Sequence, residues 1–256
     1  MSANTDNPIK SEMDLILIDE YRVISNKGQE KANELFLKGA TIPEIIKFCK
    51  DYTKKEYAEK LQQEANLVKR FKMCTFERFN PYTQEFKIAY NKAKKYVDLL
   101  PEIIEDGTNI VFEGHGCVGT GKTHIGYSII NAALNSGIPA KAYNSMEFTN
   151  AVSYSSLDKK TKQIMLDIPL LMLDDLSKIC GYDWLLLELY AVLNHRYEHC
   201  KPTILTIEET ISELRKQYII NGKDRGKSIF SRICENVVIV DMRGDDYRLK
   251  RFEMEG

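Results

Sequence analysis

The 256-residue sequence lacks several features that define whole classes of protein. Its six cysteines form no CxxC pair and no cluster with histidine at zinc-ligand spacing, so we predict neither a disulfide framework nor a zinc module. No apolar run approaches the roughly 20 residues that a membrane-spanning helix needs. The polar opening MSANTDNPIKSEMD does not resemble a secretory signal. These absences predict a cytoplasmic protein with reduced cysteines and no membrane partner.

The sequence also lacks an excess of charge of either sign. It has 36 Lys and Arg residues against 37 Asp and Glu residues, which gives a formal net charge of −1. Strong non-specific binding to nucleic acid requires clustered basic residues, so any nucleic-acid surface is expected to be local. The composition, 43% hydrophobic and 29% charged, is typical of a globular protein. The length suffices for one α/β domain and a small accessory domain.

A small helical domain is predicted over residues 1–73. After a disordered tail at residues 1–10, helical patterns cover residues 14–38 and 43–71, and a break at residues 39–43 separates them. Thr41 is placed to cap the second helix, and Glu44 lies near the positive end of its dipole. The apolar stripe of this helix either packs on the first helix or faces a partner, and the pattern alone favours packing.

Residues 74–256 show the pattern of an α/β domain. A helical pattern covers residues 84–100, and residues 101–107 are predicted to break it. Short apolar runs then alternate with helix-length segments, which predicts strands at residues 109–113, 140–143, 170–173, 203–207 and 237–241. Repeated strand–helix–strand units favour a mostly parallel sheet flanked by helices on both faces.

Residues 116–123 read GCVGTGKT and match the phosphate-binding pattern GxxxxGK[ST] at every fixed position. A predicted strand precedes them and a helical stretch follows, which is the context that this loop requires. Glycines let main-chain amides converge on a triphosphate, Lys122 is expected to reach the β- and γ-phosphates, and the Thr123 hydroxyl is expected to ligate Mg²⁺. We therefore predict an ATP site formed by Gly116, Cys117, Val118, Gly119, Thr120, Gly121, Lys122, Thr123 and His124.

Two extra residues, Gly114 and His115, separate the predicted strand from the loop. They either lengthen the strand or form a bulge in the turn. We expect His115 to be an exposed loop residue outside the site, because this is the common situation of a histidine in a loop.

A second element of the site is predicted at LLMLDD, residues 170–175. Taken alone, an apolar run followed by two aspartates is more often a strand that ends in a polar turn. Its position about fifty residues after a phosphate-binding loop favours a metal site instead. Asp174 is then expected to hold the Mg²⁺, together with Thr123, and Asp175 to orient or deprotonate the attacking water.

Five landmarks in order resemble the DnaC/DnaI replicative helicase loaders and the related IstB transposition ATPases, a family of AAA+ ATPases. The resemblance runs from about residue 76 to residue 248. The landmarks are TFERF at 75–79, GTGKTHI at 119–125, LLMLDDL at 170–176, HRYEHCKPTILT at 195–206, and SRI with DYR at 231–233 and 246–248. The resemblance implies an AAA+ P-loop ATPase domain over residues 74–256, with weak ATP hydrolysis that requires assembly.

The resemblance also implies roles for single residues. Thr206 matches the sensor-I location, on a strand between the P-loop strand and the Asp174 strand, although this chain has Glu208 where the family usually has Asn. Arg232 matches the arginine finger, which completes a neighbouring subunit's site, and Arg248 matches sensor II. The implied catalytic residues are Lys122, Asp174, Asp175, Thr206, Arg232 and Arg248.

The partners implied by the resemblance are a hexameric replicative DNA helicase, single-stranded DNA and further copies of the chain, joined through their AAA+ domains. The N-terminal helical domain would bind the helicase. Two groups of basic residues are candidates for phosphate contacts, with solvated loops as the alternative: Lys141, Lys159, Lys160 and Lys162, or Lys223, Arg225 and Lys227.

Three other functions remain open at this point. The first is an IstB-like transposition ATPase that binds duplex DNA and a transposase. The second is a nucleotide-locked adaptor or an inhibitor of a host helicase loader, because Glu208 departs from the hydrolytic pattern. The third is a P-loop small-molecule kinase, which the paired aspartates and the late SRI and DYR landmarks fit less well.

Overall fold

The computed structural model describes residues 24–153, 159–179, 182–222, 224–247 and 249. The predicted tail and the predicted start of the first helix lie outside these residues. Internal contacts divide the chain into two compact units, with the division between Lys60 and Leu61. The domain boundary predicted after residue 73 stays a prediction. None of the described helices is long and apolar enough to cross a membrane.

The first unit contains helix α3 (Asn26–Leu37) and most of helix α4 (Ile42–Ala65). At the start of α4, the Thr41 amide and hydroxyl donate to a carboxylate oxygen of Glu44 at 2.8 and 2.7 Å, which lowers the pKa of Glu44. The helices enclose a small core formed by Ile24, Ala32, Ile45 and Cys49. The apolar stripe of α4 therefore packs on its neighbour at Ile45 and Cys49.

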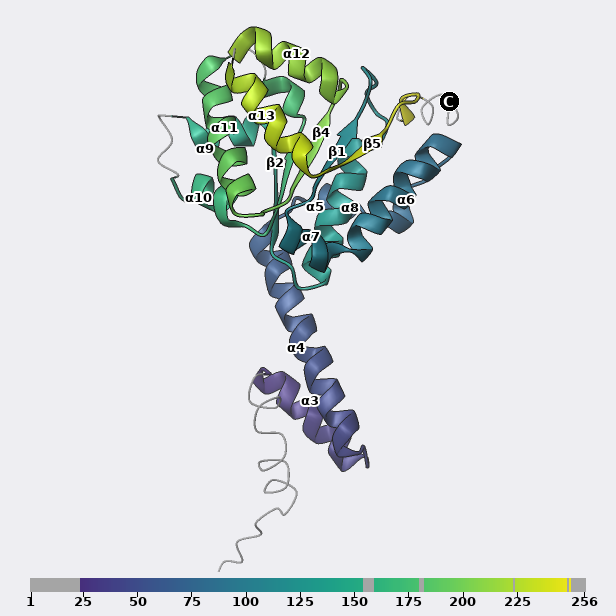
Figure 1. The fold of residues 1–256 in the computed structure, drawn as a ribbon. Helices are drawn as coiled ribbons and strands as arrows, with labels where there is room; N and C mark the ends of the chain where they lie inside the picture. Colours follow the sequence, from purple (N-terminus) through teal and green to yellow (C-terminus); the bar gives the residue numbers. More distant parts are fainter. Residues whose placement is uncertain (1–23, 154–158, 180–181, 223, 248, 250–256) are drawn as a thin grey trace, which may run out of the picture. The chain divides into compact units, whose positions relative to one another are not determined.

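The second unit contains the α/β fold predicted from the sequence (Figure 1). Its five strands are β1 (Asn109–Glu113), β2 (Ala140–Asn144), β3 (Leu170–Asp174), β4 (Thr203–Ile207) and β5 (Val237–Asp241). Its helices are α5 (Lys69–Lys72), η1 (Phe76–Arg78), α6 (Gln84–Asp98), α7 (Leu100–Asp106), α8 (Lys122–Asn135), α9 (Ser145–Val152), α10 (Lys159–Asp167), η2 (Leu176–Ile179), α11 (Asp183–Glu198), α12 (Ile211–Gly222) and α13 (Asp224–Glu235). All five predicted strands are present, and β2 and β3 each extend one residue further than predicted.

The strands form one parallel sheet in the order β2-β3-β4-β1-β5. Successive residues of a strand face opposite sides, so Ile110 and Phe112 pack with α6 and α8 whereas Val111 packs with α11, α12 and α13. Figure 1 shows these two helical layers on either side of the sheet. The AAA+ fold class predicted from the sequence is confirmed.

Strand β4 lies between β1 and β3, with Phe112 opposite Thr206 and Leu173 opposite Leu205. All carboxyl ends of parallel strands meet at one edge of the sheet. The loop after β1, the end of β3 and the end of β4 are therefore neighbours, although about 90 residues of sequence separate β1 from β4. This strand order is what brings the predicted site residues together.

Two helices predicted near the start of the chain have different bounds in the structure. Helix α3 begins only at Asn26, after the capping residue Ser25. The helix predicted over residues 43–71 is interrupted, because α4 ends at Ala65, Asn66 has a φ of 51°, and α5 begins at Lys69.

The prediction for residues 101–107 is also wrong, because these residues do not break the helical structure. Pro101 lies in the first turn of α7, where its missing amide hydrogen has no helical partner to lose. The actual break is the single turn at Leu99 between α6 and α7, and Gly107 ends α7 with a φ of 71°.

A fully buried arginine joins three segments at the amino edge of the sheet. Arg196, from the RYE stretch of α11, is 1% exposed. Its guanidinium donates five hydrogen bonds of 2.6 to 3.3 Å, all to uncharged oxygens, those of Met165, Ile168, Pro169, Pro202 and Thr203. These bonds fix the segments that lead into β3 and β4, the two strands that carry Asp174 and Thr206.

We predict that Arg196→Met lowers the free energy of unfolding by about 4 kcal/mol, because it leaves several buried carbonyl oxygens without a donor. The matched control is Arg215→Met on the exposed side of α12, which should change it by about 0.5 kcal/mol or less. Urea denaturation followed by circular dichroism measures both values. Equal losses in the two variants would contradict the structural role of Arg196.

Candidate functional site

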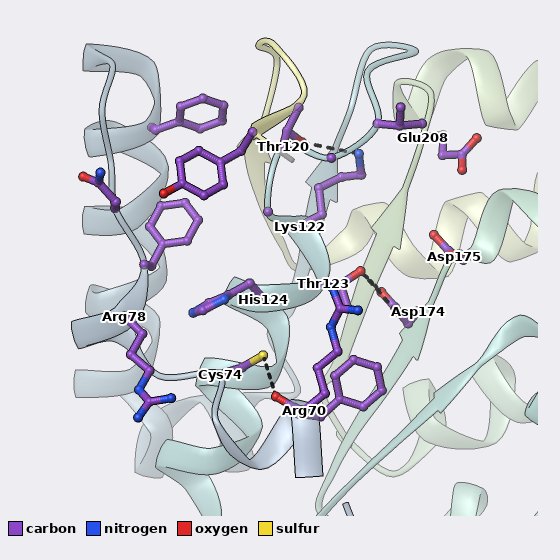
Figure 2. A pocket seen from close by; sticks show the side chains of 18 of the residues that line it. Arg70, Cys74, Arg78, Thr120, Lys122, Thr123, His124, Asp174, Asp175 and Glu208 are labelled. Carbon is purple, nitrogen blue, oxygen red and sulfur yellow. Dashed lines mark hydrogen bonds between the residues drawn. The ribbon is translucent and has the colours of Figure 1, made fainter. Parts of the chain in front are cut away.

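A cavity of about 710 Å³ lies at the carboxyl edge of β1, β3 and β4 (Figure 2). Seven of the nine predicted ATP-site residues line it, namely Val118, Gly119, Thr120, Gly121, Lys122, Thr123 and His124. Gly116 and Cys117 do not line it. The Gly116 amide donates to the Glu208 carbonyl at 2.6 Å, and the Cys117 amide donates to the Gly114 carbonyl at 2.8 Å. The backbone amides of Gly116 and Cys117 therefore already donate hydrogen bonds to carbonyl groups of the protein.

Asp174 sits at the centre of a small hydrogen-bond network. The Thr123 hydroxyl lies 3.0 and 3.2 Å from its two carboxylate oxygens, and the Thr206 hydroxyl donates to it at 2.6 Å. The Thr206 oxygen also accepts the Asp175 amide hydrogen at 2.9 Å. Burial raises the pKa of Asp174, which is 6% exposed, and the two threonine hydrogen bonds oppose that rise. The structure thus brings Thr123, Asp174 and Thr206 together.

Lys122 is buried inside its own loop. Its ammonium donates to the Cys117 carbonyl at 2.7 Å and lies 3.5 Å from the Thr120 hydroxyl. Burial lowers the pKa of Lys122, and the nearby carboxylates of Glu208 and Asp175 act in the opposite direction. An incoming anion can replace the Cys117 carbonyl as the partner of this ammonium.

Asp175 and Glu208 share one lysine at the cavity wall. The Lys178 ammonium lies 2.8 Å from a carboxylate oxygen of Asp175 and 3.8 Å from one of Glu208. The hydrogen bond to Asp175 raises the pKa of Lys178. Asp175 has a φ of 59°, so its backbone turns sharply just after β3. The carboxylate predicted to orient water is thus held by a cation from the following turn.

Sequence reasoning missed the aromatic wall of the cavity. Phe79 lies so close to the loop that a Cβ on Gly121 would come within 2.7 Å of its ring. Tyr82 and Tyr247 stack with ring centres 5.8 Å apart, and both line the cavity. The available signal was the aromatic stretch TFERF at residues 75–79, which was interpreted only as a landmark of the family resemblance.

The segment after β5 also lies on the phosphate-binding loop. The Tyr247 amide donates to the Gly119 carbonyl at 3.2 Å, and the Asp246 carboxylate occupies the space that a Cβ on Gly119 would need. Gly119 has a φ of 69°, so both its backbone and its neighbours require glycine. Arg248, predicted as sensor II, lies outside the described residues.

Residues 69–79, here called the linker, precede α6 and are attached to helix α8 at three positions. The rings of Phe71 and Tyr127 stack with centres 3.9 Å apart. The Asn131 amide donates to the carbonyls of Phe71 and Cys74 at 2.9 and 2.8 Å. The ring nitrogen of His124 lies 2.9 Å from the carbonyl of Thr75. His124 therefore lines the cavity while its side chain binds the linker.

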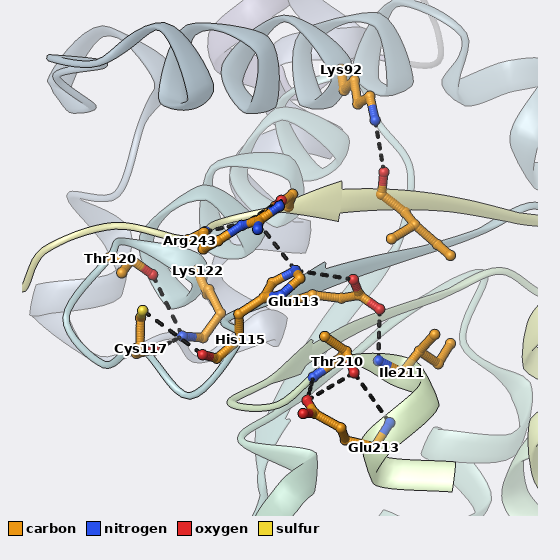
Figure 3. A network of polar contacts seen from close by, with 12 residues as sticks. Lys92, Glu113, His115, Cys117, Thr120, Lys122, Thr210, Ile211, Glu213 and Arg243 are labelled. Atoms are coloured by element: carbon orange, nitrogen blue, oxygen red, sulfur yellow. Dashed lines mark hydrogen bonds and ion pairs between the residues drawn. The ribbon is translucent and has the colours of Figure 1, made fainter.

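His115 does not line the cavity, and its ring lies beside Glu113 at the end of β1 (Figure 3). It has a φ of 51°, and its ring nitrogen lies 3.7 Å from a Glu113 oxygen and 3.4 Å from an Asp241 oxygen. Glu113 in turn accepts the Ile211 amide at the start of α12 at 2.6 Å. The extra residues form a turn, and the His115 side chain is half-buried there, not exposed as expected.

Arg232 lies at the opposite edge of the sheet. It lines a second cavity with Asn109 and Thr203, the first residues of β1 and β4. Its guanidinium sits 5.0 Å from the Tyr190 ring centre and 5.7 Å from that of Tyr197. Its buried Nε has no hydrogen-bond partner in the described part of the chain. Arg232 therefore does not reach the first cavity of its own chain.

The first predicted basic group is partly committed to internal contacts. Lys141 donates to the carbonyls of Glu64 and Ala65 at the end of α4, and Lys162 pairs with Glu188. In the second group, Lys223 lies outside the described residues. A phosphate contact by either group stays a prediction.

The comparison with known families assigns the chain. Residues 49–254 match the family described as IstB-like ATP binding protein. The chain belongs to this family. Membership of this family agrees with the geometry of the phosphate-binding loop, and it identifies the chain as an ATP-binding protein.

Two curated relatives of this IstB-like chain come from Bacillus subtilis (strain 168). YqaM, which is described as uncharacterized, is 25% identical over 233 residues that cover 79% of this chain and 70% of YqaM. The phage-like element PBSX protein XkdC is 28% identical over 195 residues that cover 73% of this chain and 70% of XkdC.

Solved structures share the fold. The crystal structure of DnaI matches with a TM-score of 0.60 and 17% identity, over 71% of this chain and 94% of the chain in that structure. The DnaC helicase loader matches with a TM-score of 0.58 and 21% identity, over 68% of this chain and 99% of that chain. The replication initiator DnaA, bound to AMPPCP and single-stranded DNA, matches with a TM-score of 0.55 over 57% of its chain.

We predict that Asp174→Asn stabilises the nucleotide-free protein at pH 7 by about 1 kcal/mol, because it removes a buried charge. The folded pKa of Asp174 lies above its ordinary value of 3.8. The stability that this group contributes is therefore present at low pH and is lost as the pH rises through the folded pKa. The difference in the free energy of unfolding between the variant and the wild type should therefore become smaller as the pH falls toward 4.

Urea denaturation at pH 7 and pH 4 measures this difference. Asp175→Asn is the matched control, because that carboxylate is paired with Lys178 and its removal should bring no gain. A less stable Asp174→Asn variant at pH 7 would show that the carboxylate is not under electrostatic strain.

Proposed function

We propose that this protein is an ATP-dependent helicase loader, which binds a hexameric replicative DNA helicase and helps to deposit it on single-stranded DNA. The main support is the extent of the fold match, which covers 71% of this chain and 94% of the solved DnaI chain, and 68% of this chain and 99% of the solved DnaC chain. The match to DnaA spans only 57% of that chain. The described helices α3 and α4 would belong to the helicase-binding part.

ATP binding would use the part of the first cavity formed by the phosphate-binding loop and the end of β3. The amides of the loop and the Lys122 ammonium would bind the phosphates, and the start of α8 adds its positive end. The Thr123 hydroxyl and the Asp174 carboxylate are hard oxygen donors, which fit Mg²⁺, and that ion would neutralise phosphate charge. Thr206 holds Asp174 in place through its hydroxyl.

Hydrolysis by a single chain would be slow for two reasons. Asp175, proposed to orient the attacking water, is paired with Lys178. Arg232, proposed as the arginine finger, lies at the opposite edge of the sheet from the cavity. A second copy would supply this arginine, and an arginine that acts in trans raises the rate on the order of 10³-fold or more.

Two other functions retain support from particular observations. The matching family is named for IstB, and one relative comes from a phage-like element, so an IstB-like transposition ATPase is the second candidate. Lys178 lies between Asp175 and Glu208, which also suits a nucleotide-locked adaptor that hydrolyses little ATP. A small-molecule kinase has no comparable support.

Gel filtration with a purified hexameric replicative helicase tests the loader function. We expect co-elution in the presence of ATP and weaker co-elution of the Lys122→Ala variant, which cannot order the phosphates. Duplex and single-stranded oligonucleotides serve as parallel ligands in the same experiment. Tight duplex binding with no helicase co-elution under either condition would reject the loader function in favour of transposition.

Mixing two inactive variants tests the shared site. We expect Lys122→Ala and Arg232→Ala each to lose basal phosphate release, the first in its own cavity and the second in a neighbour's. Their mixture should recover part of the activity, because Lys122→Ala chains still carry Arg232. Lys72→Ala, an exposed change on α5, is the control that should behave as wild type.

Phosphate release is followed over a range of protein concentrations, since assembly should make the specific activity rise with concentration. Unchanged turnover in Lys122→Ala alone would remove the P-loop assignment. A mixture no more active than its components would remove Arg232 as a residue that acts in trans.

A further inference from the structure

We propose that Arg70, which lies in helix α5 of the linker, binds the terminal phosphate of the nucleotide held by its own chain. The inference rests on the proposed ATP function of the cavity. Arg70 lines that cavity, and its side chain points toward Thr123 and Asp174 (Figure 2). Among the described residues, no carboxylate forms an ion pair with it.

The backbone around Arg70 is fixed relative to the phosphate-binding loop. Asn131 binds the carbonyls of Phe71 and Cys74, the next residue and the fourth residue after Arg70. The Phe71 ring stacks on Tyr127 of the same helix. Asn131 and Tyr127 belong to α8, the helix that begins within the loop at Lys122.

This attachment has an energetic consequence for binding. A long side chain on a mobile segment loses both backbone and side-chain freedom when it orders around a ligand. Arg70 loses only side-chain freedom, because the contacts of Phe71 and Cys74 already hold its backbone. Its exposed guanidinium remains free to turn onto an anion.

The charges of the cavity leave Arg70 as an available cation. Asp174, Asp175 and Glu208 contribute negative charge to the lining. Lys178 is paired with two of these carboxylates. A triphosphate brings further negative charge to the site, and Lys122 alone would face it from inside the loop.

The Arg70 guanidinium and the Lys122 ammonium lie on opposite sides of Thr123, and the Lys122 side chain extends toward the Cys117 carbonyl. In Figure 2, Lys122 lies above Thr123 and Arg70 lies below it. The two cations are therefore placed to bracket a phosphate near the Thr123–Asp174 pair. The planar guanidinium can donate two parallel hydrogen bonds to a phosphate, which an ammonium cannot do.

The linker also contains a matched control residue. Arg78 is an exposed arginine of the same linker and lines the same cavity, but its guanidinium points away from Thr123 and Asp174 in Figure 2. Replacement of Arg78 changes the net charge by the same amount as replacement of Arg70. A general charge effect would therefore appear in both variants.

The test measures the affinity of the full-length protein for fluorescent ATP and ADP analogues in the presence of Mg²⁺. We expect Arg70→Ala to weaken ATP binding about ten- to hundredfold, in line with the loss of a charged hydrogen bond, and to weaken ADP binding much less. Arg78→Ala should change both affinities about threefold or less. Arg70→Lys should recover only part of the ATP affinity, because lysine keeps the positive charge but cannot donate the two parallel hydrogen bonds of a guanidinium.

Three results would overturn the inference: wild-type ATP affinity in Arg70→Ala, equal losses in the Arg70 and Arg78 variants, or equal losses for ATP and ADP. Thermal melting of each variant verifies that it is folded, and Arg70→Lys supplies a second variant at the same position. Lys122→Ala separates this inference from the proposed function. If Lys122→Ala binds ATP as wild type does, the cavity itself is misassigned; if only Lys122→Ala loses ATP, the role of Arg70 alone is wrong.

Discussion

The site depends on the hydrogen bonds that hold the buried Asp174 carboxylate. Thr123 approaches it from helix α8 and Thr206 from strand β4, so one side chain joins three elements. A buried carboxylate is unfavourable unless such donors surround it. Strand order and burial thus act together, because the order places Thr206 beside Asp174 and the burial makes its hydroxyl necessary. The Thr206 oxygen also receives the Asp175 amide, which fixes the turn that follows.

Much of this arrangement could be predicted from the sequence, because it is encoded locally. Each strand is a short apolar run bounded by polar residues, and the loop pattern fixes Lys122 and Thr123 by spacing alone. The position of Thr206 between the two site strands needed the family resemblance, since no local pattern specifies strand order. Pro101 was misinterpreted because the same residue both ends helices and starts them.

The remainder of the site depends on contacts that no local pattern encodes. Tyr82 and Tyr247 stack although the whole domain separates them in sequence, and Asp246 meets Gly119 in the same way. Arg70 reaches the cavity only because its linker is bound to α8 through Phe71 and Cys74. Nothing in a lysine- and arginine-rich helix distinguishes such a residue from a solvated one.

The opposite placement of the first cavity and Arg232 constrains how copies can be stacked end to end. If the carboxyl edge of one copy stacks on the amino edge of the next, the contact uses two different surfaces, so it is heterologous and does not close into a two-fold dimer. Copies joined in this way form a head-to-tail row in which all copies have the same orientation. Unless the row closes into a ring, the cavity of one terminal copy receives no Arg232 from a neighbour. At the other end, the Arg232 of the terminal copy reaches no neighbouring cavity. The two ends of such a row are therefore chemically different.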